Sequence, residues 1–468
     1  MNLKGKKVLV IGTGVSGIAA AALLIETGAD TILYDSSEKL CQSDVRAKSQ
    51  AFENVPVLLG AAGTQQILSQ CSTAADRQEA PPYRIAVLSP GVPVDLPLVE
   101  ALRESGVSIW GEIELAYRCA KGRLAAITGT NGKTTTTALV GEILKSYFAD
   151  VKVVGNIGIP YTSLATQMTD ETVTAAEISS FQLETADTFC PDVSAILNIT
   201  PDHLNRHHTM ECYIKIKESI VKNQTPGQTC VLNYEDEALR TFGNTIETKL
   251  NVIYFSSRQT LERGLYLENG TIYYAGADGV HAVIDTGELN LLGTHNYENV
   301  MAACAVTHAL GVPFEKIREV LKIFRAVAHR IEYVGEINGV RYYNDSKATN
   351  PDAAIKGIRA MERPTWLIGG GYDKQSEYGE WIDAFDGKVV KLVLIGATKE
   401  KIAKEAAEKG FTEVVMCDSL EDAVTYCHSH AREKDAVLLS PACASWDMFP
   451  NYEKRGDIFK EIVRSYQQ

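Results

Sequence analysis

Short apolar runs, each followed by a glycine-bearing turn and then a helical pattern, recur along the chain. The first run covers 7–11, its turn covers 12–17, and an alanine-rich helical stretch covers 18–27. Runs that are apolar throughout are typical of parallel strands buried on both faces. Similar runs lie at 85–88, 124–127, 193–197, 391–396 and 436–440. The alternation of such strands with helices predicts an α/β fold with parallel sheets.

Two stretches depart from this alternation. From 228 to 292 the strand signals become antiparallel, with a hairpin predicted around Asn269-Gly270 because this dipeptide suits a tight turn. The polar stretch 70–82 ends in a Pro-Pro pair and predicts a surface loop.

The turn after the run 124–127 carries the clearest chemistry. It reads Gly-Thr-Asn-Gly-Lys-Thr from Gly129 to Thr134 and precedes a helical pattern. Glycines allow backbone N–H groups to face a phosphate, the helix N-terminus adds partial positive charge, and Lys133 adds a full charge. The hydroxyl of Thr134 suits a magnesium ion on those phosphates. The usual motif has a further glycine, and Ile127 stands in its place. The turn predicts a nucleotide phosphate loop.

Polar residues follow several strands of this middle segment. Asn156 comes after one strand, Glu177 closes the next, and Asp202-His203 follow a third. Because the carboxyl ends of parallel strands meet at one edge, these groups are expected around the phosphate loop. A carboxylate such as Glu177 is a common second ligand of a nucleotide's magnesium.

The N-terminal turn, Gly12-Thr-Gly-Val-Ser-Gly17, and the acid Asp35 at the end of the next strand form a dinucleotide-binding pattern. From these residues alone, NAD, FAD and another nucleotide all remain open. The turn 89–93 follows a later strand and is expected at the same edge.

Length, charge and cysteine content restrict the class of protein. The 468 residues suggest about three domains, and the net charge of −13 argues against nucleic acid as the main partner. Ten cysteines show no C-x-x-C pair, which suits a reducing compartment. The N-terminus lacks a signal-peptide core, and no apolar run reaches the ~20 residues of a membrane span. We expect a soluble cytoplasmic protein without membrane insertion.

Several other patterns have ordinary interpretations. The cluster Asp202-His203 and His207-His208 has no flanking cysteines, so a zinc site is not favoured. Cys443 has no dedicated histidine partner and is not interpreted as a nucleophile. Lys215, Lys217 and Lys222 lie in one predicted helix, and from position alone they indicate a solvated cationic face. The residues leave open a kinase, an ATP-driven ligase, a nicotinamide enzyme and an ATP-binding regulatory module.

A set of motifs in fixed order resembles the Mur ligase family of peptidoglycan synthesis. They are the phosphate loop, Gly155-Asn-Ile-Gly, Glu177-Ile-Ser-Ser-Phe-Gln, Asp202-His203, His295-Asn-Tyr-Glu-Asn and His329-Arg330. Asp345-Ser-Lys-Ala-Thr-Asn350 and Ser440-Pro-Ala-Cys-Ala-Ser445 resemble the member that adds D-glutamate. Asn205 departs from the pattern, since many relatives carry aspartate there. Folylpolyglutamate synthase shares the central architecture and is the nearest alternative.

The resemblance implies three domains: a Rossmann-like UDP-substrate domain at 1–111, a central P-loop-type ATP-binding domain at 112–326 and a Rossmann-like amino-acid domain at 327–468. It implies an ATP-dependent ligase, expected to be a monomer, that adds D-glutamate to UDP-N-acetylmuramoyl-L-alanine through an acyl phosphate. This step serves cell-wall synthesis, and so cell shape and division. ATP, two Mg²⁺ ions and a carbamylated Lys217 are implied as well.

The resemblance also assigns residues to each part of the site. The catalytic set is Lys133, Glu177, His203 and Lys217, and the metal set is Thr134, Glu177, His203 and Lys217. The ATP set is Gly129, Thr130, Asn131, Gly132, Lys133, Thr134, Thr135, Asn299, Arg330 and Asp345. The UDP-substrate set is Gly14, Val15, Ser16, Asp35, Ser36, Ser37, Ser89, Gly91, Asn156 and Ser179. The D-glutamate set is His203, Thr349, Lys374, Ser445, Trp446 and Tyr452.

Overall fold

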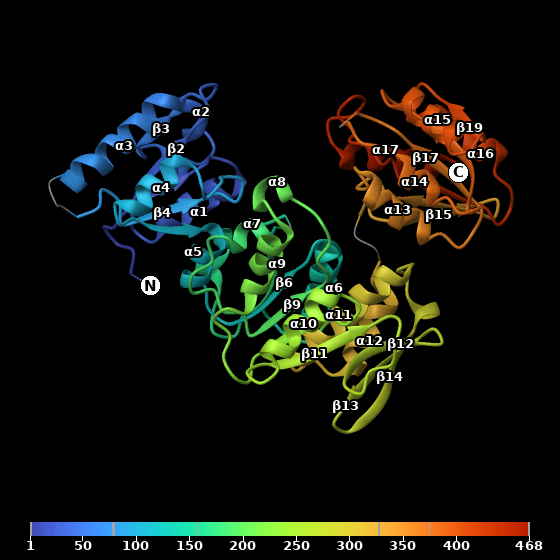
Figure 1. Ribbon diagram of the computed structural model, residues 1–468, viewed down its shortest axis with the longest axis horizontal. Helices are drawn as coiled ribbons and strands as arrows, with labels where there is room; N and C mark the ends of the chain where they lie inside the picture. The colour runs from blue at the N-terminus through green and yellow to red at the C-terminus, as the bar shows by residue number, and fades with distance from the viewer. Residues whose placement is uncertain (1, 77–79, 157, 326–327, 374, 467–468) are drawn as a thin grey trace. The chain divides into compact units, whose positions relative to one another are not determined.

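The computed structural model describes residues 2–76, 80–156, 158–325, 328–373 and 375–466. Their strands form three sheets of five, nine and six strands, in which parallel pairs predominate (Figure 1). The predicted α/β class is therefore confirmed. None of the described helices is both long and apolar enough to span a bilayer.

The first sheet is fully parallel in the order β3-β2-β1-β4-β5. Its strands are β1 (Lys7–Ile11), β2 (Asp30–Asp35), β3 (Val57–Leu59), β4 (Ile85–Leu88) and β5 (Ser108–Gly111). Its helices are α1 (Val15–Glu26), α2 (Gln42–Arg46), α3 (Gly60–Asp76) and α4 (Pro97–Glu104). A β-carbon added at Gly17, in the first turn of α1, would lie 1.9 Å from the carbonyl oxygen of Gly12. Only glycine therefore allows α1 to start so close to the end of β1.

The second sheet runs β14-β13-β12-β11-β10-β9-β6-β8-β7. Its strands are β6 (Arg123–Thr128), β7 (Val151–Gly155), β8 (Val173–Glu177), β9 (Val193–Ile196), β10 (Thr229–Asn233), β11 (Asn251–Ser256), β12 (Gly264–Glu268), β13 (Thr271–Gly276) and β14 (Gly279–Asp285). The helices of this part of the chain are α5 (Glu112–Cys119), α6 (Lys133–Lys145), α7 (Ser180–Leu183), α8 (Leu204–His207), α9 (Met210–Glu218), α10 (Glu237–Ile246), α11 (Thr294–Ala309) and α12 (Phe314–Ile323). β12 and β13 pair antiparallel around Asn269-Gly270, so the predicted hairpin is confirmed.

The third sheet runs β15-β16-β20-β17-β18-β19; β15 and β16 pair antiparallel, and the other neighbouring strands pair parallel. Its strands are β15 (Glu332–Ile337), β16 (Val340–Asn344), β17 (Thr365–Gly369), β18 (Val389–Leu394), β19 (Val414–Met416) and β20 (Ala436–Leu439). Its helices are α13 (Pro351–Arg359), α14 (Gly379–Asp383), α15 (Lys399–Glu408), α16 (Leu420–His430) and α17 (Tyr452–Ser465).

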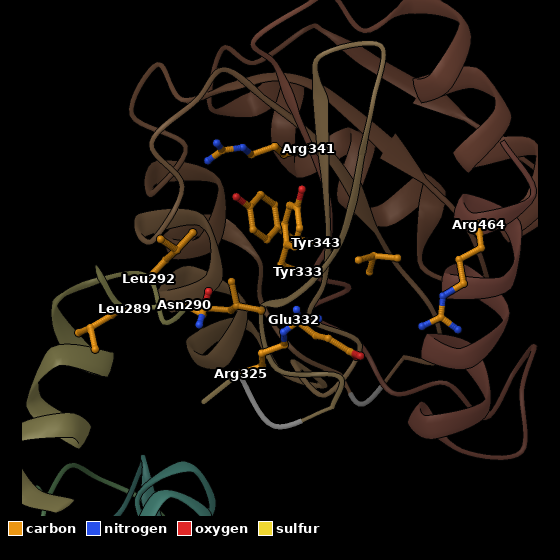
Figure 2. A pocket seen from close by; sticks show the side chains of 11 residues that line it. Leu289, Asn290, Leu292, Arg325, Glu332, Tyr333, Arg341, Tyr343 and Arg464 are labelled. Carbon is orange, nitrogen blue, oxygen red and sulfur yellow. The ribbon is translucent and has the colours of Figure 1, made fainter. Parts of the chain in front are cut away.

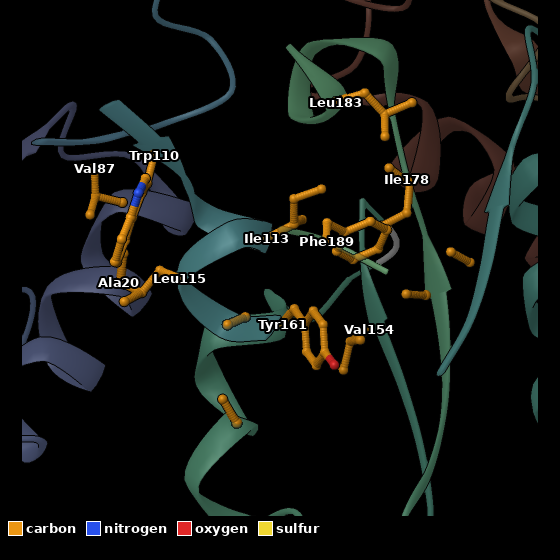
Figure 3. Close-up of a cluster of buried hydrophobic side chains, with 14 of the residues drawn as sticks. Ala20, Val87, Trp110, Ile113, Leu115, Val154, Tyr161, Ile178, Leu183 and Phe189 are labelled. Carbon is orange, nitrogen blue, oxygen red and sulfur yellow. The ribbon is translucent and has the colours of Figure 1, made fainter. Parts of the chain in front are cut away.

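The chain divides into two compact units. Unit 1 is Met1–Asp285 with Glu298–Leu321, and unit 2 is Thr286–Tyr297 with Lys322–Gln468. Within unit 1 the first two sheets share a buried core, in which Trp110 and Leu115 belong to the same cluster as Val154 and Phe189 (Figure 3). The predicted division into three domains, with its boundaries, remains a prediction.

The predicted surface loop at 70–82 is wrong over its first part, because α3 continues to Asp76. Ile67, Cys71 and Ala74 are buried along this helix at a helical spacing. Ile67 and Cys71 belong to a core cluster of the first sheet, and this packing stabilises the later turns of α3 despite the polar residues between them.

Candidate functional site

The phosphate loop joins β6 to α6, as the sequence predicts. Gly129 and Gly132 have φ angles of 149° and 86°, which L side chains rarely adopt. A β-carbon at Gly132 would also lie 2.2 Å from Asn299 Oδ1, so the loop, α6 and α11 fit closely only with glycine here. Lys133 Nζ donates hydrogen bonds to the carbonyl oxygens of Gly129 and Thr130, at 2.9 Å each. Ile127, which replaces the more distant glycine of the usual motif, is fully buried in β6.

Lys217 is buried beneath this loop. Its side chain comes from α9, its residue is 1% exposed, and its Nζ donates to the carbonyl oxygen of Gly129 at 2.8 Å. Burial lowers the pKa of Lys217 from 10.5 to about 6, and the nearby charge of Lys133 contributes to this decrease. The charge of Asp202 has a smaller, opposite effect on this pKa. The amine is therefore mostly neutral at pH 7. The hydroxyl oxygen of Tyr213, one helical turn earlier on α9, lies 3.1 Å from Thr130 Oγ1.

Glu177 closes β8 and is 2% exposed. Its Oε1 accepts a hydrogen bond from Asn156 Nδ2 at 2.8 Å. Its Oε2 is buried and has no hydrogen-bond partner within the described part of the chain. A buried carboxylate oxygen without a donor is costly unless a cation or ligand meets it, so Glu177 fits a role as a magnesium ligand.

The predicted second metal position has few acidic groups. No group of three or more His, Cys, Asp or Glu side chains suited to a metal ion occurs among the described residues. His203 is about half exposed, and its Nε2 lies 3.4 Å from Asp202 Oδ2. A carbamate on Lys217 would add oxygen ligands to a site that is otherwise poor in them.

The N-terminal turn is organised by Asp35. Its Oδ2 accepts hydrogen bonds from the backbone N–H and the hydroxyl of Thr13, at 2.8 and 2.7 Å, and its Oδ1 accepts from the Ser37 N–H at 3.0 Å. Burial raises the pKa of Asp35, but the hydrogen bonds from Thr13 and Ser37 and the charge of Lys48 outweigh it, so the pKa is lowered. Ser89 Oγ donates to the Gly12 carbonyl oxygen at 3.2 Å and joins the 89–93 turn to this loop.

Other members of the predicted UDP-substrate set lie at helix starts. Gly14 is the N-cap of α1, Val15 and Ser16 begin the helix, and Val15 is 74% exposed. Ser179 is the N-cap of α7 and accepts a hydrogen bond from the N–H of Gln182.

In unit 2, the predicted ATP residue Asp345 is buried at the end of β16. Its Oδ2 accepts from Ser440 Oγ at 2.7 Å, and its Oδ1 accepts from the Ile331 N–H at 3.3 Å. Burial raises the pKa of Asp345 to about 7, against the opposing effects of Ser440 and Arg330. The two motifs that resemble the D-glutamate-adding member are therefore in direct contact.

Arg455 is a residue that the sequence analysis missed. It is 1% exposed, and it donates from Nε to Ser346 Oγ and from Nη2 to the Ser346 carbonyl oxygen, at 2.9 Å each. It also donates to the carbonyl oxygen of Cys443 at 3.2 Å. Burial lowers its pKa to about 10, so it remains charged and ties the 345–350 segment to the 440–445 segment. No local pattern in the sequence distinguishes this arginine from Arg464 on the same helix.

The predicted D-glutamate residues of unit 2 differ in exposure. Ser445 is buried, Trp446 is 63% exposed beside Tyr372, and Tyr452 begins α17. The backbone N–H of Thr349 donates to the carbonyl oxygen of Lys347. Lys374 lies outside the described residues.

Unit 2 also contains a cavity of about 390 Å³ (Figure 2). Its lining residues include Tyr333, Tyr343, Arg325, Arg341 and Arg464. Among the predicted site residues that the structure describes, none lines it. Arg341 is already paired with Glu336 at 2.8 Å.

Comparisons with known proteins agree with the motifs. The Mur ligase middle domain matches residues 127–307, and the glutamate ligase domain of Mur ligases matches residues 329–443. The proteins named UDP-N-acetylmuramoylalanine--D-glutamate ligase in Lachnoclostridium phytofermentans and Lachnospira eligens are 53% and 52% identical over 465 residues. These alignments cover 99% of this chain and 99% and 100% of those proteins.

The fold also resembles solved structures. The UDP-N-acetylmuramate-alanine ligase MurC from Thermotoga maritima has a TM-score of 0.58 at 19% identity, over 98% of this chain and 99% of that one. A MurF ligase from the same organism, solved in complex with ADP, has a TM-score of 0.55 at 16% identity, over 99% and 96%. At these identities the similarity shows a shared fold.

Proposed function

The chain belongs to the Mur ligase family, and from this we propose that it joins D-glutamate to UDP-N-acetylmuramoyl-L-alanine with cleavage of ATP. The observation that carries the proposal is the 53% identity, over nearly the whole length of both chains, to a protein that bears the name of this activity. The reaction belongs to peptidoglycan precursor synthesis, which we place in the cytoplasm.

We propose a reaction in two chemical steps. The carboxylate of the L-alanyl group attacks the γ-phosphorus of ATP, which forms an acyl phosphate and releases ADP. The amine of D-glutamate then attacks the acyl carbon, and the tetrahedral intermediate expels phosphate to leave the new amide. Lys133 and the loop N–H groups would bind the phosphates, since the glycine conformations at Gly129 and Gly132 leave the backbone close to a ligand.

Two magnesium ions fit this site by the chemistry of its donors. Thr134 and Glu177 would hold one ion, and the buried Glu177 Oε2 supports this assignment because no described donor satisfies it. His203 and a carbamylated Lys217 would hold the second. Bound magnesium would neutralise charge on the transferring phosphoryl group.

The carbamate of Lys217 needs a neutral amine, which bonds to the carbon of carbon dioxide and loses one proton to solvent. The pKa of Lys217, lowered to about 6 by burial, supplies that neutral amine at pH 7. Without the carbamate, the second ion would have only His203 from the predicted set, and a neutral nitrogen alone is a poor partner for magnesium.

We assign the UDP-substrate to the N-terminal sheet and D-glutamate to unit 2. UDP would bind at the α1 start and Asp35, with Ser89 and Gly91 beside the sugar nucleotide. D-Glutamate would bind at Thr349, Lys374, Ser445, Trp446 and Tyr452, where a cation and hydroxyl donors suit two carboxylates.

Oxygen isotope transfer tests the proposed chemistry. The substrate would carry ¹⁸O in its L-alanyl carboxylate, and the phosphate product would be analysed by mass spectrometry. One labelled oxygen should appear in phosphate, because the carboxylate oxygen that bonds to phosphorus leaves with it. Phosphate without label, at full turnover, would contradict an acyl phosphate.

A further inference from the structure

The loop that carries Asp202 and His203 is held in an unfavourable backbone conformation. His203 and His208, which flank the short helix α8, have φ angles of 52° and 66°. Non-glycine residues in this region cost on the order of 1 kcal/mol or more each, and persist where surrounding contacts determine them. The side chains of Arg206 and His207, on the helix between them, supply such contacts.

Arg206 makes three kinds of contact within unit 1. Its Nε and Nη2 donate to the two carboxylate oxygens of Glu184, at 3.1 and 2.6 Å. Its guanidinium lies 5.0 Å from the ring centroid of Phe181. Its Nη2 also donates to the carbonyl oxygen of Val92 at 2.8 Å. The side chains of Arg206 and Glu184 are 12% and 7% exposed, so solvent screens this pair little.

The bond to Val92 links two sheets. Val92 lies in the 89–93 turn after β4 of the first sheet, whereas Glu184 and Phe181 follow β8 of the second. Arg206 therefore connects the turn proposed for the UDP-sugar with the loop proposed for the second metal ion and the substrate carboxylate.

His207 also contacts Glu184. It is 4% exposed, its Nδ1 lies 3.3 Å from Glu184 Oε1, and its Nε2 lies 3.0 Å from Ser180 Oγ. Its ring packs 5.2 Å from that of Tyr213 on α9, the helix that carries Lys217. Arg206 and His207 thus both contact Glu184.

We propose that Arg206 is a positioning residue, which sets the distance between the bound UDP-sugar and the Asp202–His203 loop by bridging Val92 and Glu184. The proposal rests on the proposed function, because it assigns those two positions to the substrate and to the second metal ion. Arg206 itself acts through the loop and does not take part in the chemistry.

A second arginine–glutamate pair in unit 1, Arg118 and Glu114, provides a control that distinguishes an effect on positioning from an effect on stability. Arg118 also pairs with a buried carboxylate, that of Glu114, and also lies over an aromatic ring, 4.3 Å from the centroid of Trp110. Its side chain is 22% exposed, and the partners it has among the described residues, Glu114, Asp187 and Trp110, lie outside the loop at 201–208. Arg118→Met is therefore the control for Arg206→Met.

The experiment compares steady-state kinetics and thermal unfolding of the full-length wild type, Arg206→Met, Arg206→Lys and Arg118→Met. We expect Arg206→Met to lower kcat/KM for UDP-N-acetylmuramoyl-L-alanine on the order of 100-fold, because a displacement of ~1 Å at a reacting group has that effect. Its KM for ATP should stay within about two-fold, since uniform loss of folded enzyme changes no KM. Arg206→Lys should recover part of the loss, because lysine keeps the charge but not the forked geometry.

Arg118→Met should lose stability to a similar degree and keep both KM values. Equal kinetic effects of the two methionine variants, or an Arg206→Met enzyme with wild-type constants, would overturn the proposal. If Arg206→Met does not fold, Glu184→Gln is measured in its place. This variant should raise the KM for the UDP-substrate, and an unchanged KM would overturn the proposal. A wild type that forms no ADP from these substrates would instead refute the proposed function.

Discussion

Replacing Lys217 by methionine is expected to make the protein more stable and at the same time nearly inactive. The ammonium group has a pKa of 10.5 in an unfolded chain, and burial lowers it to about 6 in the fold. Keeping this amine neutral at pH 7 therefore costs roughly 5 kcal/mol of folding free energy. Methionine fills a similar volume without that cost.

The methionine also loses the hydrogen bond from Lys217 Nζ to the Gly129 carbonyl oxygen. The Gly129 carbonyl keeps its hydrogen bond from Lys133 Nζ, so the loss lowers the gain in stability by only about 0.5–1.5 kcal/mol. We therefore expect the free energy of unfolding to rise by about 4 kcal/mol at pH 7. The assay is urea unfolding followed by circular dichroism, in buffer depleted of carbon dioxide so that the wild type carries a free amine.

The pH dependence gives a second, independent check. Between pH 6 and 10.5 the unfolded wild type binds more protons at Lys217 than the folded protein does, so wild-type stability rises with pH in this window. The advantage of Lys217→Met should therefore shrink steadily as the pH rises from 7 toward 10. Lys215→Met is the control, because Lys215 is exposed on the same helix and should show no such trend.

Activity completes the test. Lys217→Ala should be nearly inactive and partly rescued by small carboxylates, which can occupy the positions of the carbamate oxygens. A Lys217→Met protein that is less stable than the wild type at pH 7, with a difference that does not change with pH, would refute the reasoning about burial. Full activity of Lys217→Ala would refute the proposed role.

Three further predictions concern the other parts of the site. Glu177→Gln should lower kcat on the order of 100-fold or more and raise the magnesium concentration needed for half-maximal rate, because a neutral amide replaces the buried carboxylate; an unchanged magnesium response would remove Glu177 from the metal site. Calorimetry on the intact protein should show binding of a UDP-sugar and none of NAD, with Asp35→Asn weakening the former; tight NAD binding that competes with the UDP-sugar would contradict the assignment. Lys374→Ala should raise the KM for D-glutamate much more than that for ATP, and equal effects on both would place Lys374 elsewhere.

The parts of the fold that depend on local pattern could be predicted from the sequence. The uninterrupted apolar run 124–127 lies in β6, and the Asn-Gly dipeptide lies in the turn between β12 and β13. Such features follow from burial on both faces of a strand and from the backbone preferences of glycine. The loop 129–132 was predictable for the same reason, since its positive φ angles fall on glycines.

Features that depend on distant contacts could not be predicted in this way. The three lysines of the 213–222 stretch suggested a solvated face, which is right for Lys215 and Lys222 and wrong for Lys217. Only the packing of α9 beneath the phosphate loop distinguishes them. Hydrogen bonds from Arg206 and Arg455 join segments that are about 110 residues apart in the sequence, and no periodicity in the sequence indicates these contacts.

The most direct test of the central claim is ADP release by the intact enzyme with UDP-N-acetylmuramoyl-L-alanine, ATP and magnesium, in parallel reactions with D-glutamate, L-glutamate, meso-diaminopimelate and no amino acid. We expect that D-glutamate alone supports sustained ADP release, and that the product has the mass of both substrates joined with loss of one water. Equal turnover with L-glutamate, or ADP release without a joined product, would contradict this claim.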